Sequence, residues 1–403
     1  MREKIRLWVQ PDNGKPIYLD KIRDMRGKFL FKDKPLFLIA LVILVNFFIF
    51  LDGESYGENR QSWIKKTPHG FIKDGKPFRF IGASAVNMVF YDDWDLDIEK
   101  AIRTAKENNI SVLRFYMDWG WSKDEDFDKI VDMASRYGIY VILTFTDCCC
   151  SSEYPSFKKY LELHASFCNI ENKNNMEAFK KRIKKIIQRR NSINGKVYRD
   201  DSTILAWEIA NELEYWHFSY PEVHKWVSEI GVYIKSLDKN HLITISVSTD
   251  IVGFDKDSQL YEIFNVPELD FISFHFYPTV RISNSDKIVL DSDYPKKIEY
   301  RIKKFLSLNK PVVMGEFGFS NSADLNHKFK TNKETGGLYN LVFKKSMDSA
   351  FLAGASGAMF WGWGVPEEKT VPMWWRSETH NSDDEIFCRF LKQYHIPDKN
   401  VNN

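Results

Sequence analysis

The feature that most constrains the fold is an alternation of short apolar runs with longer, charged amphipathic stretches from about residue 71 onward. The runs are apolar throughout, and apolar and polar residues do not alternate within them. Strands of this kind are typical of a parallel sheet buried on both faces by helices. Eight strands are predicted, at residues 80–85, 112–117, 140–145, 205–210, 242–247, 271–276, 311–314 and 355–361.

The order of the elements indicates how such a sheet closes. Helices are predicted between or after most strands, at residues 95–108, 125–137, 176–190, 221–237 and 338–353. Eight strand–helix units over about 330 residues fit an α/β fold of the (β/α)8 or TIM barrel type. A doubly wound open sheet is the alternative, but it normally has a Gly-rich phosphate turn after its first strand. The segment GASAVN at residues 82–87 is not such a turn.

A second apolar run, at residues 36–51, has Asn46 as its one polar residue. It is close to the length that spans a bilayer as a helix, and it lacks the amphipathic pattern of a core helix. Residues 1–34 hold ten Lys or Arg against five Asp or Glu, and acidic residues follow the run. The positive-inside rule then predicts a cytoplasmic N-terminus, a single-pass transmembrane helix and an extracytoplasmic remainder. The alternative is that the run belongs to a cleaved signal peptide and that the protein is secreted. Initiation at Met25 would give this peptide a more ordinary shape.

The chain is therefore expected to have four parts. They are a basic cytoplasmic arm at residues 1–34, a transmembrane anchor or signal peptide at 35–52, a linker at 53–67 and the barrel domain at 68–403.

Composition excludes several classes of protein. A hydrophobic share of 44% with 15% aromatic residues excludes a disordered chain. The formal net charge is +2 and no domain is strongly basic, which argues against nucleic acid as a partner. No Cys-x-x-Cys pair and no Cys/His cluster with metal-ligand spacing is present, so neither a metal nor another cofactor is predicted. For Cys148–Cys150, a disulfide from one of them to Cys168 and a set of small apolar loop residues are both consistent with the sequence.

In a (β/α)8 barrel the active site lies at the C-terminal ends of the strands, so the residues there are the candidates. These ends carry two carboxylates, Glu212 after AWEIAN and Glu316 within VVMGEFG. The further polar and aromatic candidates are Arg114, Asn211, His275, Tyr277 and Trp361. We expect all of these side chains to converge on one rim.

Two carboxylates at neighbouring strand ends suit the hydrolysis of a glycosidic bond. One donates a proton to the leaving oxygen, while the other attacks or stabilises the anomeric carbon. Arg114 and His275 near the second carboxylate would favour its charged form. A tyrosine can donate a hydrogen bond to it, and a tryptophan offers a flat apolar face to a pyranose ring.

The segments AWEIANE, SFHFYP, VVMGEFG and MFWGWG occur in this order and resemble glycoside hydrolase family 5, especially its endo-β-1,4-mannanase branch. The resemblance covers about residues 68–365. It implies a retaining enzyme that cleaves a β-linked polysaccharide and needs no metal. After the third strand, the segment TFTDCCCSSEYPS at residues 144–156 departs from the mannanase pattern. This difference concerns the identity of the substrate more than the chemistry.

By position, the resemblance makes Glu212 the acid/base and Glu316 the nucleophile. It assigns Arg114 and Asn211 to positioning the nucleophile and the sugar 2-hydroxyl. The family's His-x-Tyr pair and the tryptophan beneath the cleaved sugar correspond to His275, Tyr277 and Trp361.

Some of these residues also have a structural interpretation. Glu316 could cap a helix, and His275 could be a hydrogen-bonded core histidine. Glu208 and Glu214 compete with Glu212 for the acid/base role. Glu208 lies in the middle of its predicted strand and is interpreted as a buried partner, whereas Glu214 follows in the loop.

Three further alternatives remain at this stage. Arg114 could pair with a structural carboxylate, as many barrel arginines do. The same chemistry would serve a β-glucan hydrolase or a transglycosylase. A protein that binds envelope polysaccharide without cleaving it is the alternative from another class.

Overall fold

The computed structural model divides the chain into two compact units, residues 1–58 and 59–403. The residues it describes all lie in the second unit. They are residues 61–85, 98–117, 123–148, 170, 172–213, 219–249, 257–282, 288–290, 292–318, 320–321, 338–363 and 385–398.

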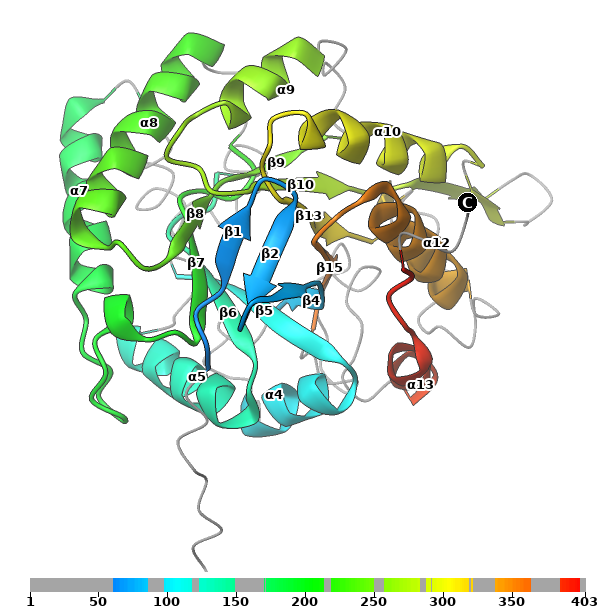
Figure 1. Cartoon of the computed structure of the whole chain (residues 1–403), viewed down its shortest axis with the longest axis horizontal. Helices are drawn as coiled ribbons and strands as arrows, with labels where there is room; N and C mark the ends of the chain where they lie inside the picture. The colour runs from blue at the N-terminus through cyan, green and yellow to red at the C-terminus, as the bar shows by residue number, and fades with distance from the viewer. Residues whose placement is uncertain are drawn as a thin grey trace, which may run out of the picture. The chain divides into compact units, whose positions relative to one another are not determined.

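A sheet of nine parallel strands forms the centre of this unit, in the order β8-β7-β6-β5-β4-β15-β13-β10-β9 (Figure 1). The strands are β4 (Phe80–Ser84), β5 (Ile110–Tyr116), β6 (Tyr140–Thr144), β7 (Ile204–Glu208), β8 (Leu242–Thr244), β9 (Ser246–Ser248), β10 (Ile272–Phe276), β13 (Val312–Phe317) and β15 (Gly357–Trp361). Every one of the eight predicted strands is found, with ends shifted by at most three residues.

The ends of this sheet meet at Ile245. Strand β8 pairs with β7 and strand β9 pairs with β10, and Ile245 alone separates β8 from β9. The stretch predicted as one strand at residues 242–247 is therefore two short pieces, and together they close the sheet into a barrel. This closure confirms the prediction of a (β/α)8-type barrel over the doubly wound sheet.

Helices surround the barrel (Figure 1). They are α4 (Ile98–Glu107), α5 (Asp124–Tyr137), α7 (Lys173–Ile187), α8 (Tyr220–Leu237), α9 (Asp257–Phe264), α10 (Tyr294–Leu306), α12 (Leu338–Ala353) and α13 (Glu385–Gln393). Helix α5 shows the local causes of such boundaries. Three acidic residues occupy its first turn, where they favour the positive end of the helix dipole, and Gly138 ends it in the left-handed region at φ 68°.

A three-stranded antiparallel sheet covers the N-terminal end of the barrel. It comprises β1 (Lys65–Thr67), β2 (Gly70–Lys73) and β3 (Lys76–Phe78), and β1 lies within the segment expected to be linker. Asp74 and Gly75, both at positive φ, form the two-residue turn from β2 to β3. Phe71 packs against Phe80 and Phe271, at the start of β4 and just before β10. These contacts seal the end opposite the predicted site.

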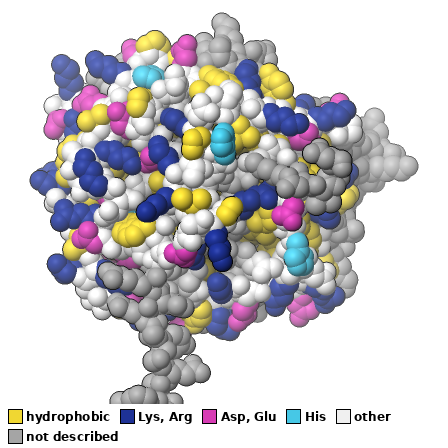
Figure 2. All heavy atoms as spheres, viewed as in Figure 1, with side chains coloured by type: hydrophobic (Ala, Val, Ile, Leu, Met, Phe, Trp, Pro, Cys, Tyr) yellow, Lys and Arg dark blue, Asp and Glu magenta, His cyan; other side chains and the backbone are white. Residues whose placement is uncertain are grey.

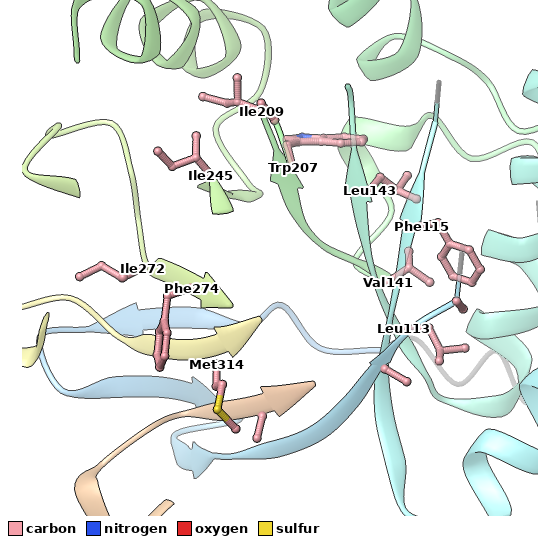
Figure 3. Packing of buried hydrophobic residues seen from close by; sticks show 14 of the residues in the cluster. Leu113, Phe115, Val141, Leu143, Trp207, Ile209, Ile245, Ile272, Phe274 and Met314 are labelled. Carbon is pink, nitrogen blue, oxygen red and sulfur yellow. The ribbon is translucent and has the colours of Figure 1, made fainter. Parts of the chain in front are cut away.

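Residues along β5 alternate between the barrel interior and the layer beneath the helices. Leu113 and Phe115 belong to the large cluster between sheet and helices (Figure 3), whereas Val112 belongs to the interior cluster. Arg114 and Tyr116 follow Val112 at a spacing of two, so they point into the barrel. The interior is thus apolar at its N-terminal end and polar toward its C-terminal end.

A third, small sheet lies beside the C-terminal ends of β10 and β13. Its strands are β11 (Thr279–Ile282), β12 (Ile288–Leu290) and β14 (Ser320–Asn321), in the order β12-β11-β14. Because β11 follows β10 after two residues, this sheet continues the barrel wall on the side of the predicted site.

Basic and acidic side chains are interspersed on the face seen in Figure 2. Two basic side chains of α7 have acidic partners: Lys180 Nζ lies 2.7 Å from a Glu229 carboxylate oxygen, and Arg182 Nη1 lies 2.7 Å from Asp124 Oδ1. Among the helices that the structure describes, none combines the length and apolar character needed to cross a bilayer. The anchor predicted at residues 35–52 falls outside the described part of the chain.

Candidate active site

Glu316 and Glu212 come together at the C-terminal end of the barrel. Glu316 lies in β13, where it pairs in register with His275 of β10, and Glu212 follows β7 by four residues. A carboxylate oxygen of Glu212, one of Glu316 and a ring nitrogen of His275 all lie within 4.8 Å of one another. The side chains of Glu212 and Glu316 are 11% and 4% exposed, so Glu212 is the more accessible of the two.

Both oxygens of the Glu316 carboxylate accept hydrogen bonds. Oε1 accepts from Arg114 Nη1 and from the Tyr116 hydroxyl, the latter at 2.7 Å. Oε2 accepts from the Tyr277 hydroxyl at 2.6 Å, and His275 Nδ1 lies 3.4 Å from it. Donors on both oxygens hold the carboxylate in one orientation.

His275 links the two carboxylates. Its Nδ1 lies 2.7 Å from Glu212 Oε1, while its Nε2 is buried and has no hydrogen-bond partner among the described residues. These contacts assign the ring proton to Nδ1, which donates to the carboxylates. His275 therefore acts as a spacer that fixes Glu212 relative to Glu316.

The backbone at Glu212 is unusual. It has φ 41°, and the other described non-glycine residues with positive φ are Asp74, Asn109 and Asn309. Asp and Asn tolerate this region, whereas for a glutamate it is uncommon and costs free energy of order 1–3 kcal/mol. The Glu212 N–H donates to Ser246 Oγ at 3.3 Å, which helps to hold this conformation. The chain thus stores local strain in the turn that directs Glu212 toward His275.

Arg114 is the centre of the hydrogen-bond network beneath the two carboxylates. It is 1% exposed, and its three nitrogens donate to groups on several strands. Besides Glu316, the acceptors are Glu208 Oε2 at 2.5 Å and Oε1 at 2.7 Å, Asn211 Oδ1 at 2.6 Å, Tyr116 Oη at 2.8 Å, Ser246 Oγ at 3.1 Å and Ser84 Oγ at 3.4 Å. One guanidinium therefore sets the positions of the nucleophile candidate and of Asn211.

Burial and charge act on Arg114 and Tyr116 in opposite directions. Burial lowers the pKa of Arg114, but Glu208, Tyr116 and Glu316 together raise this pKa well above its usual range. Burial, assisted by Glu316, raises the pKa of Tyr116 well above its usual range despite the opposing charge of Arg114. Tyr116 is thus a neutral phenol and an effective donor to Glu316.

Asn211 is held from both sides. Its Oδ1 accepts from Arg114 and, at 3.2 Å, from Ser246 Oγ, while its Nδ2 donates to Asp147 Oδ1 at 2.7 Å. Asp147 and Asn211 also form an isolated parallel β-bridge, so the ends of β6 and β7 stay paired beyond the strands.

The two tryptophans of the segment MFWGWG, Trp361 and Trp363, have different surroundings. Trp361 is partly exposed, and its ring centre lies 6.3 Å from that of Tyr116 in an edge-on arrangement. Trp363 is fully buried, and its Nε1 donates to the carbonyl of Ala101 in α4 at 3.0 Å. Trp361 is therefore placed beside the site, whereas Trp363 packs the barrel against a helix.

Comparison with known proteins agrees with this geometry. A sequence model of the family described as "GH family 5 beta-mannosidase-like" matches residues 100–385. The chain belongs to glycoside hydrolase family 5.

Two plant proteins illustrate the similarity within family 5. Mannan endo-1,4-beta-mannosidase 1 of Oryza sativa subsp. japonica is 28% identical over 266 residues, which cover 59% of this chain and 60% of the rice protein. Mannan endo-1,4-beta-mannosidase 5 of Solanum lycopersicum is 24% identical over 363 residues, covering 79% of this chain and 86% of the tomato protein.

Solved structures of family 5 proteins share the fold. The endo-1,4-beta-D-mannanase of Thermotoga petrophila is 23% identical, with a TM-score of 0.59 over 79% of this chain and 99% of that protein. The family 5 mannosidase of Rhizomucor miehei is 19% identical, with a TM-score of 0.64 over 83% of this chain and 97% of that protein. At these identities the likeness concerns the fold.

The seven site residues predicted from the sequence all lie within the described part of this family 5 barrel, and the contacts above bring them together. No role had been assigned to Tyr116 from the sequence. Glu208 had been interpreted as a buried partner, which its contact with Arg114 bears out. Asp147 and Ser246 had not been singled out. The spacing of two between Arg114 and Tyr116 was the available signal for Tyr116, because it puts both on one face of β5.

Glu212, His275 and Glu316 are also close enough together to hold a metal ion. Their donor set argues against a cation between them, because both oxygens of Glu316 already accept hydrogen bonds and the Arg114 guanidinium adjoins one of them.

Some other predictions lie outside the described residues. Glu214 is among them, as are Cys149, Cys150 and Cys168. Cys148 is part of a disulfide, so it is not one of the free small apolar residues that the sequence had left as an alternative.

Proposed function

We propose that this family 5 protein is a retaining glycoside hydrolase that cleaves β-1,4-linked mannan within the chain by double displacement. The observation that carries the mechanism is the separation of the two carboxylates, whose nearest oxygens lie within 4.8 Å. Retaining glycosidases hold their carboxyl groups about 5–5.5 Å apart, whereas inverting ones need about 6.5–9.5 Å to admit a water. The names of the plant relatives support mannan as the substrate.

In the first step, a Glu316 oxygen attacks the anomeric carbon, and the bond from this carbon to the leaving oxygen breaks. Glu212 gives its proton to that oxygen, so the aglycone leaves as an alcohol. In the second step, Glu212 takes a proton from a water that attacks the same carbon, and Glu316 is released. Arg114, Tyr116 and Tyr277 hold Glu316 on one side of the reacting carbon throughout.

The test of substrate and chemistry together is reducing-sugar release by the full-length chain on β-mannans, β-glucans and xylans. We expect release from mannan, with mixed lengths of oligosaccharide early in the reaction as cleavage within the chain requires. Release from glucan or xylan but not from mannan would agree with the proposed mechanism and would show that mannan is not the substrate. Binding of these glycans with no release from any of them would favour a polysaccharide-binding protein.

The role of Glu212 makes a prediction about the leaving group. A Glu212→Gln variant cannot donate a proton, so we expect its kcat/KM on mannan to fall roughly 10²–10⁴-fold, the usual contribution of general acid catalysis. A glycoside with a dinitrophenyl leaving group needs no protonation, so its glycosylation step should be nearly unaffected. Burst kinetics on the two substrates measure this difference. Equal losses on both would contradict the acid/base role.

We also propose that residues 35–52 anchor the enzyme as a single-pass segment with the barrel outside the cytoplasm. The run at residues 36–51, which is apolar except for Asn46, and the basic residues before it support this. The anchored protein should stay in the membrane fraction after an alkaline wash and be digested by protease added to intact cells. Recovery in the medium with residues 1–52 removed would favour the cleaved signal peptide.

A further inference from the structure

We propose that Glu208 is a positioning residue for the nucleophile. It holds the Arg114 guanidinium in place and takes up part of its positive charge, so that Arg114 orients Glu316 and neutralises its carboxylate only in part. This inference rests on the proposed function, because it concerns the same site.

The geometry separates Glu208 from the reacting groups and joins it to Arg114. Arg114 donates from Nε at 2.5 Å and from Nη2 at 2.7 Å to the two oxygens of Glu208, which is a two-point contact on one edge of the guanidinium. Thr144 Oγ1 donates to Glu208 Oε2 at 2.8 Å. At 1% exposure, Glu208 has no access to substrate and acts through Arg114.

The other part of the guanidinium, Nη1, donates to Glu316. One positive charge is therefore shared by two buried carboxylates, and a net negative charge remains between them. If Arg114 faced Glu316 alone, the ion pair would favour the carboxylate form more strongly and would make its oxygen less nucleophilic. The charged and titratable side chains around this network are Tyr116, Asp147, Glu212, His275, Tyr277 and Glu316.

Glutamine at position 208 keeps the shape of the side chain and removes its charge. Because a negative charge is lost, nearby carboxyl groups ionise at lower pH. Both limbs of the bell-shaped pH profile of kcat/KM should therefore move to lower pH, by about one unit. We expect kcat of the Glu208→Gln variant to fall about tenfold or more with KM little changed.

Two further variants separate charge from structure. Glu208→Asp keeps the charge but cannot span both donors, so the pH profile should stay in place while kcat falls about tenfold. Asp128→Asn is the matched control, since Asp128 is another fully buried carboxylate in a two-point contact, with Arg189, away from the site. This control should lose thermal stability and keep the wild-type pH profile.

The deciding experiment titrates the Glu316 carboxyl by ¹³C NMR in the full-length chain, alongside the pH profiles, with the resonance assigned from Glu316→Gln. In Glu208→Gln, a midpoint about one pH unit lower supports the proposal, and an unchanged midpoint overturns it. If Glu208→Gln does not fold, wild-type kcat in a folded Glu208→Asp overturns the proposal instead. The titration needs no substrate, so it tests the positioning role of Glu208 even if the protein cleaves no glycan. That last result would refute the proposed function only.

Discussion

Replacing Glu316 with glutamine is expected to lower kcat/KM on the substrate by roughly 10⁴-fold or more, which corresponds to about 5 kcal/mol of transition-state stabilisation. The amide has no anionic oxygen to form the glycosyl ester on which the second step depends. Glutamine keeps the volume of the side chain and one hydrogen-bond acceptor. The substitution should therefore lower the reaction rate much more than the stability of the fold.

The measurement is kcat/KM for the wild type and for Glu316→Gln, with a thermal melt of each. Glu177→Gln is the matched control, because it makes the same chemical change at an exposed side chain on α7 and should be fully active. If Glu316→Gln kept more than about a tenth of wild-type activity, Glu316 would not be the nucleophile.

Replacing Arg114 with methionine is expected to cost about 3–5 kcal/mol of folding free energy, the usual result of removing one partner from a buried ion pair. Two carboxylates, Glu208 and Glu316, would then be buried without the cation that now contacts both. Activity should fall together with stability, because Glu316 and Asn211 would lose their shared donor.

Denaturant unfolding measures this cost in folding free energy. The same measurement at two pH values tests whether the cost comes from the buried carboxylates. A buried carboxylate without a cation is easier to bury in its protonated form, so the stability deficit of Arg114→Met should be smaller at acidic pH than at neutral pH. Arg114→Lys keeps the charge, but one ammonium cannot reach Glu208, Glu316 and Asn211 together, so it should recover part of the stability and little of the activity. A methionine variant as stable as the wild type at pH 7 would contradict the account of Arg114.

The barrel strands could be predicted from the sequence because each is a continuous apolar run bounded by polar residues, and burial on both faces requires that pattern. The N-terminal sheet was missed because its strands have three or four residues and carry exposed lysines such as Lys65 and Lys76. Its clearest signal was Asp74-Gly75, a dipeptide typical of tight hairpin turns. Helix α10 was also missed, although Ile298 and Ile302 lie on its buried face at helical spacing.

The carboxylates of the site could be predicted because a parallel barrel brings strand ends to one rim, whatever the exact register. The contacts of Arg114 could not. Glu208 is 94 positions away from Arg114 in sequence and Glu316 is 202 positions away, and their meeting depends on the stagger between strands. Register shifts interrupt several strand pairs, including β10 with β13 between Phe274 and His275. Such shifts have no signature in the sequence of either strand.

The most direct test of the central claim is the configuration of the product at the moment of cleavage. Proton NMR of wild-type enzyme on a mannan oligosaccharide, or on another β-glycan that it cleaves, follows the anomeric signals before mutarotation. Double displacement through Glu316 predicts that the β-anomer appears first and the α-anomer only later, by mutarotation. Early appearance of the α-anomer would mean inversion by a single displacement and would contradict the roles assigned to Glu212 and Glu316.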